Sequence, residues 1–281
     1  MPRKIFIAVC AVILLMAVAP IAVTGFTGFL NLFRAHATEK PVLLVGADTP
    51  HGPPGGWPEQ GIFGTYNMAA VQRGYQVYKE VCSNCHSMKL LSYRDLTQLG
   101  FDKADVKAIA AGYKVPTLND QGQPAERAAL PSDPFVSPFP NEKAARASFN
   151  GALPPDLSLI IKAREGHEDY VYSILTGFGR PVPADEKPVP NKFYNPWFSG
   201  HWISMPPPLS DNSVTFADGT KATVAQEAKD VVQFLAWASE PHLAERHEIG
   251  IKVVLFLIAF AAVMYGIKKR IWGRLKRRDR A

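Results

Sequence analysis

The sequence is short of cysteine. Only three of its 281 residues are cysteines, and Cys10 lies in an apolar segment close to the N-terminus, which leaves Cys82 and Cys85. A tetrahedral zinc site would need more thiolates or a spaced histidine pair, and none accompanies these two residues. No internal repeat and no low-complexity tract is visible. The two remaining cysteines therefore have to be explained as a pair.

The central part of the chain also lacks an excess of basic charge, although the whole sequence has a formal net charge of +6. Eight basic residues from Lys268 onward, against Asp279, give the C-terminal tail a charge of +7. Between Thr38 and Glu248 there are nineteen Lys and Arg against twenty-four Asp and Glu, a balance of −5. Because the central part is acidic, a nucleic acid is excluded as its partner.

Long apolar runs are confined to the two ends, and each is about long enough to cross a bilayer. The run from Ile5 to Val23 follows two basic residues, an arrangement typical of an export signal. Residues 1–37 are therefore predicted to be an export signal or a retained N-terminal apolar segment. Two small-x-small sites are candidate cleavage points, Ala35-His36-Ala37 and Val23-Thr24-Gly25.

The second apolar run, residues 249–267, contains Lys252 as its only charge. It is followed at once by the basic residues of the tail, and by the positive-inside rule that tail stays in the cytoplasm. The sequence thus predicts a transmembrane helix over 249–267 in contact with lipid, a basic cytoplasmic tail over 268–281 and an extracytoplasmic domain over 38–248. A buried core helix is the alternative for this run.

The run from Cys82 to His86 reads Cys-Ser-Asn-Cys-His, the C-x-x-C-H signature of covalent haem attachment. Two thiols at this spacing can add to the two vinyl groups on one edge of the porphyrin, and the next residue brings an imidazole under the iron. Cys82 and Cys85 are therefore predicted to form thioether bonds to one haem c, with His86 as the proximal iron ligand. A surface disulfide or a thioredoxin-like redox pair remains an alternative, but the latter expects a strand and a βαβ unit.

Two helices are predicted around this motif. Asn67 can cap a helix that runs to about Val81, and residues 223–226, Thr-Val-Ala-Gln, read as a capping box for a helix that runs to about Ser239. Apolar residues recur every three or four positions in both segments.

The first of these segments carries Gly74 and Tyr78, eight and four residues before Cys82. They resemble the glycine and the aromatic residue at which the first and last helices cross in class I c-type cytochromes. Glycine inside a helix costs about 1 kcal/mol relative to alanine, so the close approach of a second helix is a reasonable compensation.

A six-coordinate electron-transfer haem needs a second axial residue, usually Met or His. Met205 is the candidate that remains after the other methionines are excluded by position. It precedes three prolines, which favour an extended path that can hold a thioether sulfur at iron. His201 in the same loop is the rival and implies a lower potential. The excluded residues are Met1 and Met16 in the export segment, Met264 in the second apolar run, Met88 just after His86, and Met68 at the start of the first helix.

Taken together, these residues resemble the cytochrome c1 family, and the resemblance extends from about Gly61 to Arg278. The C-x-x-C-H motif marks any c-type cytochrome, whereas a Gly-Ala-Leu-Pro-Pro-Asp-Leu run joined to a C-terminal anchor with a basic tail is specific to this family. Four stretches carry the resemblance: residues 72–78 with the haem motif, residues 150–158, residues 168–177, and residues 203–208.

The resemblance implies a mostly α-helical, class I cytochrome c-like haem domain with one C-terminal transmembrane helix. Long Pro- and Gly-rich loop insertions are expected over residues 113–141 and 180–208. It also implies a haem-pocket wall at Pro154 and Pro155, with a nearby backbone carbonyl as the acceptor for the second ring nitrogen of His86.

Two further expectations follow from the resemblance. Arg127 is expected to be the partner of a haem propionate, with a solvated loop arginine as the alternative. Some bacterial relatives brace the methionine loop with a second cysteine pair, and this chain has none to spare. Met205 is therefore expected to be held by packing and proline stiffness alone.

As a cytochrome c1, the chain would be the haem subunit of a cytochrome bc1 complex in the bacterial inner membrane, with its haem domain in the periplasm. It would accept single electrons from the Rieske iron–sulfur protein, work beside cytochrome b and reduce a cytochrome c. A tethered cytochrome of another oxidoreductase and a non-redox membrane adaptor remain the alternatives. Two acidic clusters are expected in exposed loops and would steer a basic cytochrome c: Glu165, Glu168 and Asp169, and Asp185 and Glu186.

Overall fold

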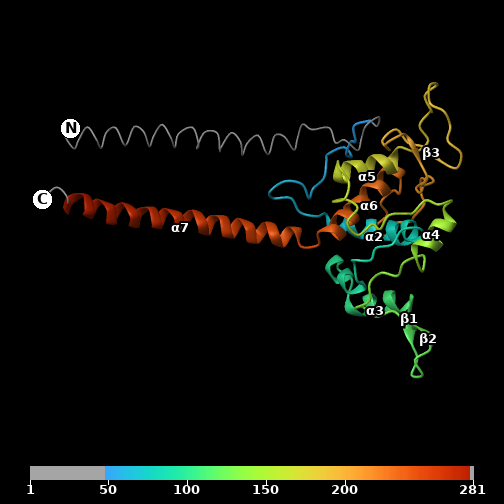
Figure 1. The fold of residues 1–281 in the computed structure, drawn as a ribbon, viewed down its shortest axis with the longest axis horizontal. Helices are drawn as coiled ribbons and strands as arrows, with labels where there is room; N and C mark the ends of the chain where they lie inside the picture. Colours follow the sequence, from blue (N-terminus) through green and yellow to red (C-terminus); the bar gives the residue numbers. More distant parts are fainter. Residues whose placement is uncertain (1–47, 279–281) are drawn as a thin grey trace. The chain divides into compact units, whose positions relative to one another are not determined.

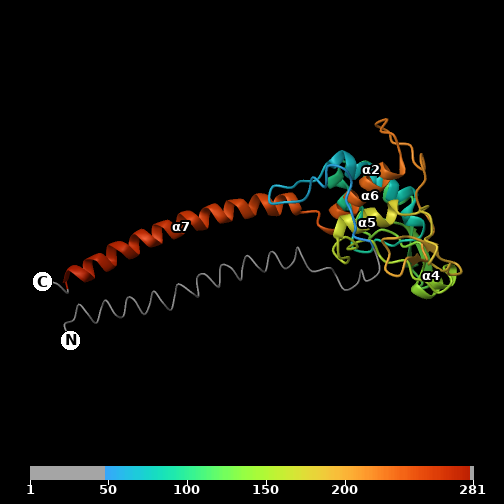
Figure 2. The ribbon, with the colours of Figure 1, turned by 90° about the horizontal axis from the view of Figure 1, so that it is seen from above.

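The computed structural model describes residues 48–278. The expected export segment with Cys10, and residues 279–281 of the basic tail, lie outside the described residues. In chain order the described elements are α2 (Met68–Glu80), η2 (Cys82–Asn84), η3 (Tyr93–Leu99), α3 (Lys103–Ala111), β1 (Lys114–Leu118), β2 (Pro124–Ala128), α4 (Glu142–Ser148), α5 (His167–Thr176), β3 (Phe193–Tyr194), β4 (Trp202–Ile203), α6 (Val224–Ser239) and α7 (Leu243–Arg278). Figures 1 and 2 show these elements from two directions.

Helices provide most of the regular structure, which confirms the predicted mostly α-helical class. The two predicted loop insertions are only partly loops. Residues 113–141 contain the antiparallel hairpin β1–β2, in which Lys114 pairs with Ala128, and residues 180–208 contain the short pair β3–β4. The prolines of the first insertion suggested a loop, but both strands of a two-stranded hairpin are edge strands, where proline is tolerated.

The two predicted core helices form where the sequence places them. The side chain of Asn67 accepts a hydrogen bond from Ala70 N at 3.3 Å and begins α2, and the side chain of Thr223 accepts from Gln226 N at 3.2 Å and begins α6. The second half of the predicted capping box is not formed. The Gln226 amide donates instead to the carboxylate of Asp230, at 3.0 Å, because that buried acceptor lies one turn further along α6.

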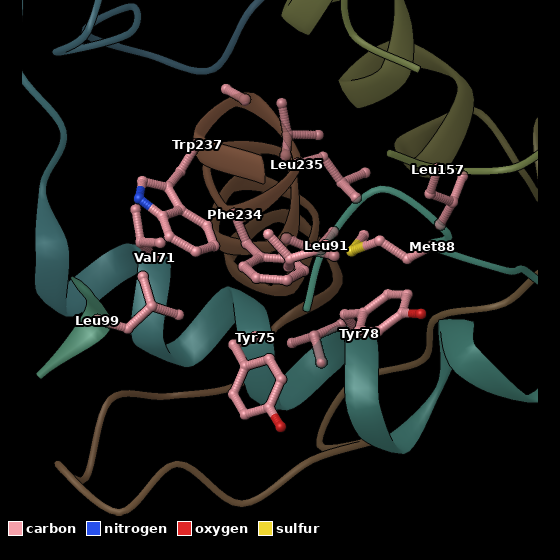
Figure 3. Packing of buried hydrophobic residues seen from close by; sticks show 14 of the residues in the cluster. Val71, Tyr75, Tyr78, Met88, Leu91, Leu99, Leu157, Phe234, Leu235 and Trp237 are labelled. Atoms are coloured by element: carbon pink, nitrogen blue, oxygen red, sulfur yellow. The ribbon is translucent and has the colours of Figure 1, made fainter. Parts of the chain in front are cut away.

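Helices α2 and α6 cross at Gly74, as the sequence predicted. A Cβ atom at this position would collide with the Asp230 carbonyl oxygen and would lie 2.8 Å from Cβ of Phe234. The missing side chain therefore lets the two backbones approach closely. Figure 3 shows the aromatic residues around the crossing, where the rings of Tyr78 and Phe234 have centroids 5.5 Å apart.

A buried ion pair lies at the same crossing. The Asp230 side chain is fully buried, and it accepts hydrogen bonds from Arg73 Nε at 2.7 Å and Nη2 at 3.0 Å. Arg73 Nη1 also donates to Asp218 at 2.8 Å. The Gln226 amide also donates to the buried Asp230 carboxylate. These hydrogen bonds offset the cost of removing the charge of Asp230 from water.

Helix α7 is longer than the predicted apolar run, beginning before residue 249 and continuing past residue 267. The flanking residues are mostly Ala, Glu, Lys and Arg, which are strong helix formers, so the helix continues beyond the apolar run at both ends. It is the one described helix long and apolar enough to cross a membrane, and no part of its apolar window is buried within the protein.

Glu59 is a buried acid whose two carboxylate oxygens have no hydrogen-bond partner among the described residues. Burial raises its pKa from an ordinary 4.5 to about 7, and the charge of Glu168 acts in the same direction. The folded protein therefore holds a proton at Glu59 that the unfolded chain releases between these two pKa values. The contribution of this group to stability is complete below pH 4.5 and is lost as the pH rises toward 7.

Replacing Glu59 with glutamine is expected to stabilise the fold by about 2 kcal/mol more at pH 8 than at pH 5, after allowance for screening by nearby solvent. The amide stays neutral at both pH values, so it avoids the cost of the buried charge. Thermal unfolding of the purified protein in detergent measures the effect. Glu126→Gln, at an exposed position on β2, is the matched control and should change nothing at either pH. Equal stabilisation by Glu59→Gln at both pH values would contradict a buried proton.

Candidate haem site

The C-x-x-C-H motif forms a tight turn directly after α2. The helix ends at Glu80, and residues 82–84 continue as a short 3-10 turn. Cys85 N and His86 N both donate to the Cys82 carbonyl, at 3.1 and 3.0 Å. The turn therefore brings both thiols and the imidazole onto one connection, and the two cysteines are not joined by a disulfide.

The two thiols lie in an environment that disfavours thiolates. Burial raises the pKa of Cys82 to about 12 and also raises the pKa of Cys85. Thioredoxin-like exchange proceeds through a thiolate, which this burial disfavours. Residues 48–278 contain no group of three or more His, Cys, Asp or Glu side chains able to hold a metal ion.

His86 is oriented by a residue 69 positions away in sequence. Its Nδ1 donates to the backbone carbonyl of Pro155 at 2.8 Å, which is the kind of acceptor expected near this proline pair. Burial lowers the pKa of His86 below its ordinary value, so the ring is neutral at physiological pH. The bond at Nδ1 fixes the tautomer and leaves the lone pair of Nε2 available, with no hydrogen-bond partner in the described part of the chain.

Four further hydrogen bonds join residues 87–90 to residues 156–158. The Asp156 carboxylate accepts from Ser87 Oγ at 2.7 Å and from Lys89 N at 3.0 Å. Ser87 O accepts from Leu157 N at 2.8 Å, and Ser158 Oγ accepts from Leu90 N at 3.0 Å. Burial alone would raise the pKa of Asp156, but its hydrogen bonds hold it below the usual range. The Pro-Pro-Asp-Leu-Ser run therefore supports the segment that carries His86.

The Met205 loop is attached on both sides of the methionine. Before it, β4 pairs with β3, with Ile203 opposite Phe193. After it, Leu209 packs against the hydrophobic core. Met205 itself is half-buried. The expectation that packing and proline stiffness alone hold this loop is therefore incomplete, because a β-pairing also fixes its N-terminal side.

The rival ligand His201 is engaged at one ring nitrogen. The carboxylate of Glu186 contacts His201 Nδ1 at 2.5 Å and accepts from Trp202 Nε1 at 3.2 Å. The bond to His201 is the main cause that lowers the pKa of Glu186. Glu186 thus anchors the base of the loop at His201 and Trp202, four and three residues before Met205.

The residues present fit a haem c group. The motif turn offers two thiols three positions apart in the chain and, in the next residue, an imidazole with Nε2 available. The loop at residues 201–209 offers a thioether sulfur on a chain segment stiffened by proline. Imidazole and thioether are the donor pair that suits an electron-transfer haem.

Residues 57–275 match the cytochrome C1 family. This chain belongs to the cytochrome c1 family. It is 44% identical to "Cytochrome c1" of Rhodospirillum rubrum, over 78% of this chain and 87% of that protein. It is 42% identical to "Cytochrome c1, heme protein, mitochondrial" of Saccharomyces cerevisiae, over 81% of this chain and 74% of that protein. It is also 45% identical to "Cytochrome b/c1" of Bradyrhizobium diazoefficiens over 79% of this chain, but spans only 36% of that longer protein.

Membership in the cytochrome c1 family makes the chain a haem electron carrier of the bc1 complex and confirms the predicted resemblance. The chain is an electron-transfer subunit of that complex. This membership excludes a cytochrome that serves another oxidoreductase and a non-redox adaptor with a disulfide.

Arg127 lies on β2 and is paired with Asp133. Its Nη1 and Nη2 donate to the two carboxylate oxygens at 2.6 and 2.9 Å, and Nη1 also donates to Ala128 O. The hydrogen bond from Arg127 lowers the pKa of Asp133 to about 2. The propionate role of Arg127 stays a prediction. In that role the guanidinium would have to bind a haem propionate in addition to the carboxylate of Asp133.

The expected location of the acidic clusters is partly wrong. Glu168 and Asp169 lie in the first turn of α5, where negative charge complements the helix dipole, and not in a loop. Asp169 also accepts a hydrogen bond from Trp57 Nε1 at 2.6 Å, and Glu186 is engaged at the base of the methionine loop. Of these acids, Glu165 and Asp185 are exposed to solvent.

Sequence reasoning did not identify Asp156, Ser158 and Glu186 as residues that support the site. Asp156 and Ser158 lie in the run that carried the family resemblance, but nothing local indicated that they would pair with residues 87–90. Glu186 was interpreted only as surface charge. The hydrogen bonds of these three residues depend on partners that are far away in sequence or on another loop. A single sequence does not indicate such partners.

Proposed function

We propose that this chain binds one haem c through Cys82 and Cys85, with His86 and Met205 as the axial ligands, and relays single electrons from the Rieske iron–sulfur protein to a cytochrome c. When bound, the haem supplies a one-electron redox couple. The hydrogen bond from His86 Nδ1 to Pro155 carries the proposal, because it presents Nε2 as a ligand from the motif turn. Pro155 and the paired segments behind it would hold the imidazole in one orientation.

The residues of this chain would favour fast electron transfer by holding the two axial ligands rigidly. The segment with His86 is joined to residues 155–158 by five hydrogen bonds, and the methionine loop is attached at Ile203 and Leu209. Rigid ligands change position little between two redox states, which lowers the reorganisation that accompanies each electron. No general acid, base or nucleophile is required of the chain, and quinol chemistry would belong to the partner subunits.

The proposed location is the bacterial inner membrane, with α7 as a single span, residues 38–248 in the periplasm and residues 268–281 in the cytoplasm. The apolar window of α7 and the basic residues that follow it support this orientation. A relative named "Cytochrome b/c1", which is much longer than this chain, supports cytochrome b as a neighbour in the complex.

A haem stain on a denaturing gel tests the attachment. The unmodified chain should keep its haem after denaturation, and Cys82→Ser with Cys85→Ser should lose all covalent haem. A reduced-minus-oxidised spectrum of the purified membrane complex should then show a c-type band together with a b-type band. Haem lost from the unmodified chain on denaturation would overturn the proposal of covalent attachment.

Electron transfer to a basic cytochrome c is expected to slow as ionic strength rises, because screening shortens the Debye length to about 8 Å at physiological salt. The exposed acids Glu165 and Asp185 are the ones to test, and Glu165→Gln with Asp185→Asn should flatten the dependence. Asp120→Asn with Glu126→Gln, in the β1–β2 hairpin, removes the same amount of charge and should leave the salt dependence unchanged. Stopped-flow rates over a salt series measure the effect. A rate indifferent to salt in the unmodified protein would point to apolar docking or a tethered acceptor.

A further inference from the structure

An apolar turn is exposed in the segment that leads into α2. The side chains of Ile62 and Phe63 are 74% and 80% exposed, more than Phe256 on α7 at 66%. Gly64 N donates to Gly61 O at 3.1 Å, so residues 61–64 form a tight turn with Ile62 and Phe63 at its centre. Central turn positions are usually taken by Gly, Pro, Asn, Asp or Ser. Two large apolar residues there leave a large apolar surface without a partner among the described residues.

The turn is held in shape by its surroundings. Gly61 has φ +89°, a left-handed conformation that favours glycine. A Cβ atom at Gly64 would collide with the backbone carbonyl of Glu59, so the backbone is closely packed at this end. Thr65 N also donates to Pro58 O at 3.0 Å. The two apolar side chains are therefore presented outward by a fixed backbone.

The same turn is attached to the start of α7. His247 Nδ1 donates to Gly64 O at 3.0 Å, and the Tyr66 hydroxyl donates to Glu240 O at 3.1 Å, just before α7 begins. Figures 1 and 2 both show this blue segment beside the first turns of α7. At a rise of 1.5 Å per residue, His247 lies about 9 Å before Val253, where the uncharged apolar stretch begins. Side chains of an interfacial segment reach about 5–10 Å into the boundary of a bilayer.

We propose that Ile62 and Phe63 insert into the lipid interface beside α7 and form a second membrane contact of this chain. The inference rests on the proposed span of α7. Two uncharged side chains fit a lipid surface better than a protein partner, since a stable protein interface needs about 800 Å² from each side. The contact would limit tilting of the preceding domain about the single helix that anchors it.

Spin labels in lipid nanodiscs test the proposal on the full, haem-loaded chain. Labels are placed at Phe63→Cys, Phe256→Cys on α7 and Leu118→Cys on β1, in a Cys10→Ser background that leaves no other unmodified thiol. Leu118, 66% exposed, is the matched control away from the turn. Collision with oxygen, which enters lipid, is compared with collision with a nickel chelate, which stays in water. We expect the label at 63 to collide with nickel several-fold less than the label at 118, and the label at 256 to collide least.

Equal access of nickel to the labels at 63 and 118, with the label at 256 protected, would overturn the insertion and leave the span of α7 intact. Access of nickel to the label at 256 would overturn the span itself and the insertion with it. Protection of the label at 63 only in the assembled complex, and not in nanodiscs of this chain alone, would overturn the lipid contact in favour of a protein neighbour.

Discussion

Replacing Met205 with leucine is expected to lower the midpoint potential of the haem by an amount on the order of 100 mV, because thioether coordination stabilises the ferrous state relative to the ferric state. The thioether bonds at Cys82 and Cys85 should keep the haem attached, so covalent haem content stays unchanged. A potentiometric titration of the purified complex measures the shift. Oxidation of the Rieske partner should be blocked in the same variant.

The control for this variant is Met88→Leu, because Met88 is a fully buried methionine that packs near Tyr78 and Leu157 (Figure 3). It should shift the potential by less than about 30 mV, which corresponds to about 0.7 kcal/mol for one electron. If Met205→Leu also shifts the midpoint potential by less than about 30 mV, Met205 is not the ligand. His201→Ala would then be the variant to measure, and a lower starting potential would accompany that result.

Replacing Gly74 with alanine is expected to destabilise the fold by about 3 kcal/mol or more, since the new Cβ would collide with backbone atoms of Asp230. A backbone carbonyl cannot move aside as a flexible side chain can, so α2 and α6 must separate. Separation would also loosen the ion pair between Arg73 and Asp230. Thermal unfolding followed by far-UV circular dichroism should show a large fall in melting temperature.

Gly250→Ala is the matched control for this change. Gly250 also lies in a helix, α7, but a Cβ atom there would meet nothing within 4 Å. The melting temperature of that variant should stay at or slightly above the value of the unmodified protein, because alanine is the better helix former. If Gly74→Ala behaves in the same way, the crossing of α2 and α6 has room that the packing around Asp230 and Phe234 does not indicate.

The sequence by itself determined the features that depend on near neighbours. The C-x-x-C-H spacing follows from the porphyrin, and α2 begins at Asn67 because its side chain can cap the backbone three residues later. Gly74 was identified because a glycine inside a helix needs an explanation. The length of the apolar run in α7 indicated a membrane span, and the charge balance indicated an acidic domain before it. Each of these signals lies within a short stretch of chain.

Only the tertiary structure decided which residues support the site and where the turn at Ile62 and Phe63 lies. The Pro155 carbonyl is 69 residues from His86, and no local pattern selects it from other carbonyls. Asp156 and Glu186 were visible as acidic residues, but their hydrogen bonds depend on how loops meet. Glu59 has an ordinary sequence context and is unusual only because it is buried with no hydrogen-bond partner in the described part of the chain. The physical reason is that periodicity and caps report local free energies, whereas burial and long-range hydrogen bonds exist only once the whole chain has folded.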